Sequence, residues 1–169
     1  MSKRRKAAMW FVWGLCSMWG VSAFAQDAAP DLMQSTFGVT VSGSDDVFAV
    51  QPYWQPGRVQ VGPEFSYRGE EQRYGAELVV KYFAIEDAKL NLYLVNDIPT
   101  SAYIGLGIGG AWDKDWKFEN AATGRTGVIF GKDPVRFGVV YIYRMDEAFW
   151  KGAGEGEHEV RGEIMIKTW

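Results

Sequence analysis

Apolar and polar residues alternate along most of the chain after residue 35, and this period of two predicts β-strands rather than helices. Turn-forming residues interrupt the alternation at short intervals, as in the run Gln55-Pro56-Gly57-Arg58. A series of short strands joined by turns is typical of an antiparallel all-β domain. The strands are expected at 36–42 with 47–54, 59–68, 73–84, 89–96, 101–112, 124–131, 135–145 and 158–168.

The number of strands depends on how the first two of these segments are interpreted. Counted separately, they give nine strands, which is an odd number for an up-and-down barrel in a membrane. A single first strand with a bulge at residues 43–45 gives eight, and it accounts for the change of apolar parity between Val41 and Phe48. Pro63 has no amide hydrogen and predicts a further local bulge within its strand. We therefore expect an all-β fold, a closed antiparallel up-and-down barrel of about eight strands.

The two faces of these strands differ in polarity. One parity is apolar and contains no charged residue, with Leu78, Leu106 and Val139 as examples. The opposite parity carries every charge of the strands, so the barrel has one apolar wall and one charged wall. The charged residues expected to face one another are Glu64, Arg68, Arg73, Glu77, Lys81, Arg125, Arg136, Arg144, Arg161 and Glu163.

Two barrel architectures share this alternation and are inside-out versions of each other. A soluble, periplasmic lipocalin-like barrel turns its apolar face inward around an apolar ligand, whereas a transmembrane barrel turns that face toward lipid. Gly105, Gly107 and Gly109 fall on the charged parity, where each glycine on a water-exposed surface would cost up to about 1 kcal/mol. In a narrow lumen the same glycines leave room for long charged side chains. They therefore favour the transmembrane barrel.

Aromatic residues and connection lengths favour the same orientation. Aromatic belts are found at both interfaces of a membrane. We expect one belt at Tyr67, Tyr74 and Phe137, and the other at Trp54, Tyr82, Trp112 and Tyr143. Short connections at 69–72, 97–100 and 132–134 are expected on the periplasmic side, and long ones at 113–123 and 146–157 outside; the short connection 85–88 departs from this rule.

Three features carry a family resemblance: Tyr103-x-Gly105-x-Gly107-x-Gly109, a last strand that ends at Trp169, and alternation over nearly the whole mature chain. In these features the chain resembles the small eight-stranded outer-membrane barrels, the class of OmpA-like and OmpX-like proteins. The resemblance implies a porin-like architecture in a bacterial cell envelope, in contact with outer-membrane lipid and lipopolysaccharide. It also implies insertion by the outer-membrane assembly machinery, which reads a last strand with a terminal aromatic residue.

The first 25 residues have the three parts of a secretory signal peptide. A basic stretch from Lys3 to Lys6 precedes an apolar run, and Ala23-Phe24-Ala25 supplies an A-x-A cleavage pattern. We expect a signal peptide at 1–25, a periplasmic leader at 26–35 and an outer-membrane barrel domain at 36–169. Of the 18 basic residues four lie in the signal peptide, so the mature chain has 14 against 21 acidic residues, a formal charge of −7. This balance argues against nucleic acid as a partner.

Catalysis is not favoured by the sequence. Some barrels of this architecture remove or transfer acyl chains of lipid A with a histidine and a serine or acidic partner, but the comparable region 139–147 contains neither histidine nor serine. His158 is the only histidine, and no serine has a spacing that would pair with it. We assign no catalytic residue, metal or cofactor. A lipid A-modifying enzyme and a soluble barrel with an apolar ligand are kept as alternatives.

The expected turn at 69–72 sets Glu64 opposite Glu77 and Arg68 opposite Arg73. Like charges in directly opposed positions are destabilising unless a third group lies between them. Opposed carboxylates can indicate acid/base chemistry, but the surplus of arginine and lysine on the same face favours a salt-bridge network that fills the lumen. A lumen filled in this way would conduct poorly at this strand count.

We therefore expect a structural or surface-interaction role that the long loops 113–123 and 146–157 carry. Four aromatic residues of these loops are candidates for contact with lipopolysaccharide or a partner; the alternative is that they belong to the interfacial belt. They are Trp116, Phe118, Phe149 and Trp150.

Overall fold

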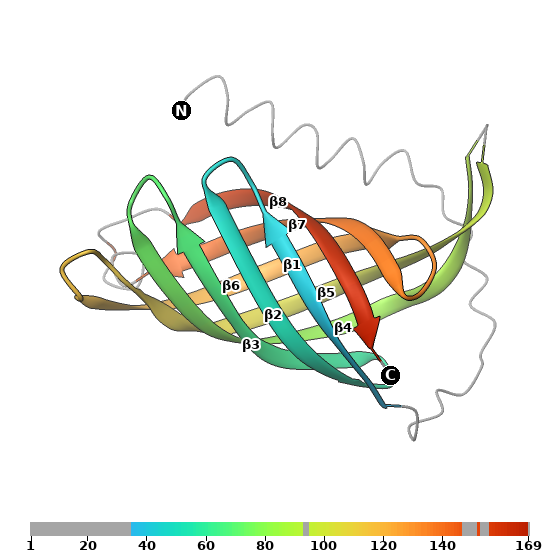
Figure 1. The fold of residues 1–169 in the computed structure, drawn as a ribbon, viewed down its shortest axis with the longest axis horizontal. Coiled ribbons are helices and arrows are strands. Elements are labelled where there is room, and N and C mark those ends of the chain that lie inside the picture. The colour runs from blue at the N-terminus through green and yellow to red at the C-terminus, as the bar shows by residue number, and fades with distance from the viewer. Residues whose placement is uncertain (1–34, 93–94, 147–151, 153–155, 169) are drawn as a thin grey trace.

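Eight antiparallel strands form a closed barrel in the described part of the chain (Figure 1). The computed structural model describes residues 35–92, 95–146, 152 and 156–168. Each strand pairs with the next along the chain, and β1 pairs with β8 to close the barrel, which confirms the closed eight-stranded antiparallel architecture. The strands are β1 (Ser35–Gly43), β2 (Val47–Pro56), β3 (Val59–Arg68), β4 (Arg73–Leu92), β5 (Val95–Trp112), β6 (Phe118–Phe130), β7 (Val135–Asp146) and β8 (Glu157–Thr168). The described residues include no helix long and apolar enough to cross a membrane.

The charged face of the strands points inward and the apolar face points outward. Buried side chains include Lys81 at 0% and Arg161 at 1% exposure, whereas Leu106 on β5 is 68% exposed. Water-soluble proteins normally bury the opposite set of residues. This inverted distribution is the main physical property of the barrel.

The expected bulged first strand is wrong. Residues 35–43 and 47–56 are two strands joined by the turn 44–46, in which the Ser44 N–H donates to the Val47 carbonyl oxygen at 2.9 Å. The change of apolar parity that suggested a bulge instead marks this turn. Eight strands result because the expected strands 73–84, 89–96 and 101–112 form only two, with 89–96 divided between β4 and β5.

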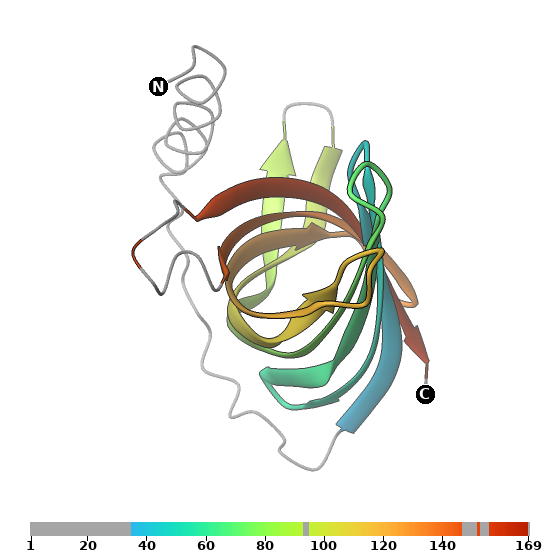
Figure 2. The ribbon, with the colours of Figure 1, turned by 90° about the vertical axis from the view of Figure 1, so that its left-hand side faces the viewer.

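The expected connections at 85–88 and 97–100 are also wrong, because both segments lie inside strands. β4 continues through 85–88 with shifts of register, so that Ile85 lies opposite Ala102 and Ala88 opposite Thr100. Asp87 takes a left-handed backbone conformation there, with φ 51°. β4 and β5 therefore run past their neighbours as a two-stranded ribbon (Figures 1 and 2).

The barrel has two distinct ends. The termini end is where β1 begins and β8 ends, together with the connections 57–58, 93–94 and 131–134; the loop end has the connections 44–46, 69–72, 113–117 and 147–156. The turn 69–72 thus lies at the loop end, and its expected place beside 132–134 is wrong. The expected division of the aromatic residues into two belts is wrong for the same reason. Phe137 lies at the termini end and not beside Tyr74, while Trp112 pairs with Tyr74 at the loop end.

Glycines on the inner face make room for larger inward side chains. A methyl group at Gly107 would lie 2.7 Å from Glu77 Oε2, and one at Gly127 would lie 2.5 Å from the Tyr103 ring. Both distances are far below van der Waals contact, so an alanine would displace its neighbour. The row of glycines on β5 therefore serves the packing of the lumen.

Pro63 does not form the expected bulge, because it lies directly opposite Leu78 in the regular ladder between β3 and β4. On its other side, the described ladder between β2 and β3 has no paired residues between the pairs Val50–Phe65 and Trp54–Val61. Pro52 and Pro63 both fall in this interval and neither can donate a backbone hydrogen bond. The β2–β3 ladder is consequently interrupted near its middle.

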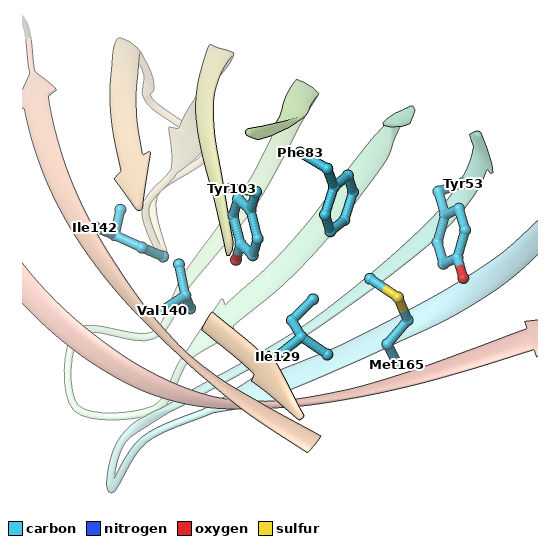
Figure 3. Close-up of a cluster of buried hydrophobic side chains, with 7 residues drawn as sticks. All are labelled: Tyr53, Phe83, Tyr103, Ile129, Val140, Ile142 and Met165. Carbon is cyan, nitrogen blue, oxygen red and sulfur yellow. The ribbon is translucent and has the colours of Figure 1, made fainter. Parts of the chain in front are cut away.

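A cluster of buried apolar side chains lies inside the barrel (Figure 3). These residues fall on the parity that the alternation assigned to charges. The sequence pattern therefore did not predict an apolar cluster on this face. The cluster consists of Tyr53, Phe83, Tyr103, Ile129, Val140, Ile142 and Met165.

Candidate functional site: the charged lumen

Glu64 on β3 and Glu77 on β4 lie directly opposite each other, as the sequence predicted. Arg125 on β6 reaches across the lumen and bridges the two carboxylates. Its Nη2 atom donates to Glu64 Oε1 at 3.0 Å and to Glu77 Oε2 at 2.7 Å, and its Nη1 atom pairs with Glu64 Oε2. All three side chains are almost fully buried, so Arg125 is the third group that the opposed carboxylates require.

Two further arginines complete the charge balance around this pair. Arg161 Nη1 donates to Glu64 Oε1 at 3.1 Å, and Arg144 Nη2 donates to Glu77 Oε1 at 3.0 Å. Thr123 Oγ1 donates to Glu77 Oε2 at 2.9 Å. Three arginines thus surround two carboxylates, so each carboxylate has hydrogen bonds from at least two cationic or polar partners. The arrangement is that of a structural ion-pair network.

Lys81 and Glu163 form a second buried ion pair. Lys81 Nζ lies 3.0 Å from Glu163 Oε1, and the Tyr103 hydroxyl donates to Glu163 Oε2 at 2.6 Å. Lys81 Nζ also lies 4.7 Å from the centre of the Tyr103 ring. Tyr103 was not among the expected site residues, although its position on the charged parity beside the glycines indicated that it points inward.

Arg68 and Arg73 lie at the loop end of the lumen. Arg68 pairs with Glu157 at 3.1 Å and Glu159 at 3.2 Å, and Arg73 pairs with Glu71 at 3.3 Å and with Glu119. Each of the two arginines therefore has its own carboxylates, and the opposed pair is compensated. Glu119 on β6 and Glu157 and Glu159 on β8 were not among the expected site residues, because pairing across the mouth cannot be seen in local sequence.

Arg136 is separate from the central network and lies at the termini end. It pairs with Asp133 and with Asp87, both at 2.7 Å, and its Nη1 atom donates to Ser101 Oγ at 3.3 Å. Lys167 pairs with Asp133 at 3.1 Å. Partial burial raises the pKa of Asp133, but the hydrogen bonds from Arg136 and Lys167 outweigh it and hold the pKa below the ordinary value.

Two small cavities lie among the side chains of the lumen. A cavity of about 20 Å³ at the termini end lies beside Gln55, Ser101 and Arg136, and one of about 10 Å³ at the loop end lies beside Arg68 and Arg144. Each is large enough for roughly one water molecule. Neither cavity could serve as a solute channel through the described barrel.

Gln51 and Gln60 project into the lumen from β2 and β3 and are 1% and 0% exposed. Among the described residues, their side-chain amides have no hydrogen-bond partner. Burial of an amide without a partner is destabilising. Gln60 is paired with Lys81 in the β3–β4 ladder, so these unpartnered amides lie next to the ionic network.

His158 lies on the outer face of the barrel rather than in the lumen. Its Nδ1 atom is hydrogen bonded to the Tyr141 hydroxyl, and its ring centre lies 4.9 Å from that of Tyr143. In the described part of the chain, no group of three or more histidine, cysteine, aspartate or glutamate side chains is arranged to hold a metal ion.

The loop candidates lie in different settings. Trp116 is 79% exposed in the turn 113–117, whereas Phe118 belongs to β6 and its ring centre lies 4.9 Å from that of Trp112. Phe149 and Trp150 lie outside the described residues.

Comparisons with known proteins provide no further assignment. No protein-family model matches the chain, and neither the curated proteins nor the solved structures gave a significant match.

Proposed function

We propose that this chain is an outer-membrane β-barrel with a structural or surface-interaction role, its lumen filled by the charged network and its loop end outside the cell. The observation that carries the proposal is the inverted barrel wall, apolar outside and ionic inside. A lipid bilayer is the solvent for which this distribution is favourable.

The outer wall would be costly in water. Ile104, Leu106 and Ile108 follow one another on the outer face of β5 and are 60%, 68% and 64% exposed. Apolar surface in water costs roughly 25 cal/mol per Å², and soluble monomers rarely carry contiguous apolar patches of more than a few hundred Å². A continuous apolar wall around a barrel exceeds that limit.

Aromatic side chains at both ends of the wall support the same placement. Phe48, Tyr67, Tyr74 and Phe118 lie near the loop end, and Phe37, Trp54, Tyr82 and Phe137 lie near the termini end; all are 40% exposed or more. Paired belts of this kind fit the two interfaces of a membrane.

The connections agree with an orientation in which the termini end faces the periplasm. The termini-end connections span two to four residues; at the loop end 44–46 and 69–72 are as short, whereas 113–117 and 147–156 are longer. Small outer-membrane barrels have short periplasmic turns and longer external loops. Lipopolysaccharide and the outer-membrane assembly machinery are then the proposed partners.

The alternatives are supported less well. A carrier of an apolar ligand needs an apolar cavity, whereas Glu64, Arg125 and Arg161 occupy the middle of this lumen. A lipid A-modifying enzyme would need a nucleophile or acid next to its histidine, whereas His158 is hydrogen bonded to Tyr141 and its ring lies beside that of Tyr143. The ionic filling also supports a structural role over diffusion through a pore.

Cell fractionation of the full chain tests the proposal. We expect the protein in the outer-membrane fraction, extracted only by detergent, with a band that shifts on gels between unheated and boiled samples. A soluble periplasmic protein followed in the same preparation controls for leakage between fractions. Release with the periplasm and no need for detergent would refute the membrane placement.

A further inference from the structure

Trp116 is the most exposed of the large apolar side chains in the described residues, at 79%. Unlike Leu106 or Phe65, it does not lie on the barrel wall. It lies in the connection 113–117 between β5 and β6, at the loop end. Membrane embedding of the wall therefore does not explain its exposure.

The backbone at Trp116 has a left-handed conformation, with φ 60°. The Trp116 N–H donates to the Asp113 carbonyl oxygen at 3.0 Å, and the Asp113 N–H donates to the Lys117 carbonyl oxygen at 3.2 Å. This is a three-residue hairpin loop whose last residue must be left-handed, a position that glycine normally fills. A bulky residue there lowers stability, and such an outlier indicates a role for the side chain itself.

Hydrogen bonds fix the backbone of the turn that carries the indole. Asp113 Oδ1 accepts hydrogen bonds from the N–H groups of Asp115 and Lys117, both at 2.9 Å. Below the turn, the paired rings of Trp112 and Phe118 close the end of the hairpin. A ring on a preorganised support loses little conformational entropy when a ligand binds.

The residues around Trp116 define the chemistry of its partner. Lys114 and Lys117 are exposed, and neither makes a salt bridge within the described residues, while Asp115 supplies one exposed carboxylate. A flat apolar ring offers a stacking surface, the two ammonium groups bind anions, and the carboxylate accepts hydrogen bonds from hydroxyl groups. A sugar that carries phosphate groups satisfies all three.

We propose that the Trp116 turn binds the phosphorylated saccharide headgroup of outer-leaflet lipopolysaccharide. The inference rests on the proposed function, because it requires the loop end to lie at the outer surface of the outer membrane. The indole stacks on the sugar, and Lys114 and Lys117 contact its phosphates.

Gln72 provides a matched control. It lies at the same end, in the turn 69–72, with φ 50° and its N–H donating to the Gly69 carbonyl oxygen at 3.3 Å. The Gln72→Gly variant relieves the same backbone conformation without removing an aromatic ring.

The test uses the full barrel in phosphatidylcholine nanodiscs, titrated calorimetrically with deacylated lipopolysaccharide, a soluble phosphorylated oligosaccharide. We expect Trp116→Gly to unfold at a higher temperature than the wild type and to bind the oligosaccharide about tenfold more weakly or not at all. Gln72→Gly should gain stability and keep wild-type affinity. The dephosphorylated oligosaccharide should bind weakly, and inorganic phosphate alone should not compete.

Each other result counts against the proposal. Wild-type affinity in Trp116→Gly, equal binding of the dephosphorylated oligosaccharide, or no binding by the wild type would overturn it while leaving the membrane barrel intact. Competition by inorganic phosphate would reduce the site to a general anion site. A chain that does not insert into the bilayer, judged by its heat-modifiable band, would overturn the proposed function and this inference together.

Discussion

Gly107 on β5 lies against Glu77 on β4, so close that a methyl group at Gly107 would be 2.7 Å from Glu77 Oε2. The same methyl group would lie 3.5 Å from Arg125 Nη2. The missing side chain on one strand is therefore a condition for the ion pair between two others. This relationship explains why a strand with a good apolar face has glycines along its other face.

Replacing Gly107 by alanine should consequently destabilise the barrel. We expect the free energy of unfolding to fall by about 1–3 kcal/mol, the usual cost of overpacking a dense interior. Urea unfolding in detergent micelles measures it. Gly124→Ala is the control, because a methyl group there meets nothing within 4 Å; an equal loss in both variants would refute the role of Gly107.

Arg125→Leu should be among the most damaging single changes in the lumen. It leaves Glu64 and Glu77 opposed and largely buried, and breaking a buried ion pair from one side costs about 3–5 kcal/mol. Combining it with Glu64→Gln removes the repulsion between the opposed carboxylates, while Arg161 keeps its hydrogen bonds to Glu159 and Arg144 keeps Glu77, so part of the lost stability should return. If the double variant is as unstable as Arg125→Leu, the damage comes from lost packing rather than from charge.

Alternation was sufficient to predict the polarity of each wall, because Glu64 and Leu106 lie on strands whose register is fixed by one buried face. It was not sufficient to place connections. The acidic segment around Asp87 is typical of a turn, but Arg136, 49 positions away, holds it inside β4 through an ion pair at 2.7 Å. No local pattern contains that contact.

The interior apolar residues show a second limit of the pattern. Val140 and Ile142 fall on the charged parity, yet both are 1% exposed inside the barrel. Parity distinguishes the two walls of a barrel, but it does not tell which part of the lumen is ionic and which is apolar. That division depends on side chains that meet across the barrel from strands far apart in sequence.

Gln60→Leu should stabilise the protein. The Gln60 amide is fully buried and has no partner among the described residues, so an apolar residue of similar size removes a penalty of about 1–2 kcal/mol. Gln55→Leu is the control, and we expect it to lower the free energy of unfolding. Gln55 Nε2 donates to the Gly57 carbonyl oxygen at 3.1 Å and to Glu86 at 3.3 Å, and leucine would lose both hydrogen bonds. Chemical unfolding of both variants distinguishes them; a loss of stability in Gln60→Leu would show that its amide is satisfied.

Acid should weaken the termini end through Asp133. Its pKa is lower in the folded protein than the ordinary 3.8, because the hydrogen bonds from Arg136 and Lys167 outweigh the effect of burial. A carboxylate with a lowered pKa stabilises the fold above its ordinary pKa, and this contribution is lost as the pH falls through the folded value. The difference in unfolding free energy between wild type and Asp133→Asn should therefore be largest near neutral pH and vanish once the pH lies below the folded pKa of Asp133. A difference independent of pH would contradict the ion pairing.

Leu106→Arg tests the medium around the outer wall. In a bilayer, an arginine on the lipid face near the midplane costs about 2–4 kcal/mol, and the cost falls to about 0–1 kcal/mol near the interfaces. Leu106 lies mid-way along β5, opposite Val80 and Gly124, whereas exposed Asn120 lies near the loop end, opposite Gly110. Asn120→Arg should therefore be nearly neutral and Leu106→Arg strongly destabilising when both unfold from lipid vesicles. In water Leu106→Arg would not be the more destabilising of the two variants, because a charge in place of an exposed leucine improves solubility at little cost to stability. If Leu106→Arg is harmless in vesicles, the residue does not face hydrocarbon, and the membrane orientation of the barrel is wrong.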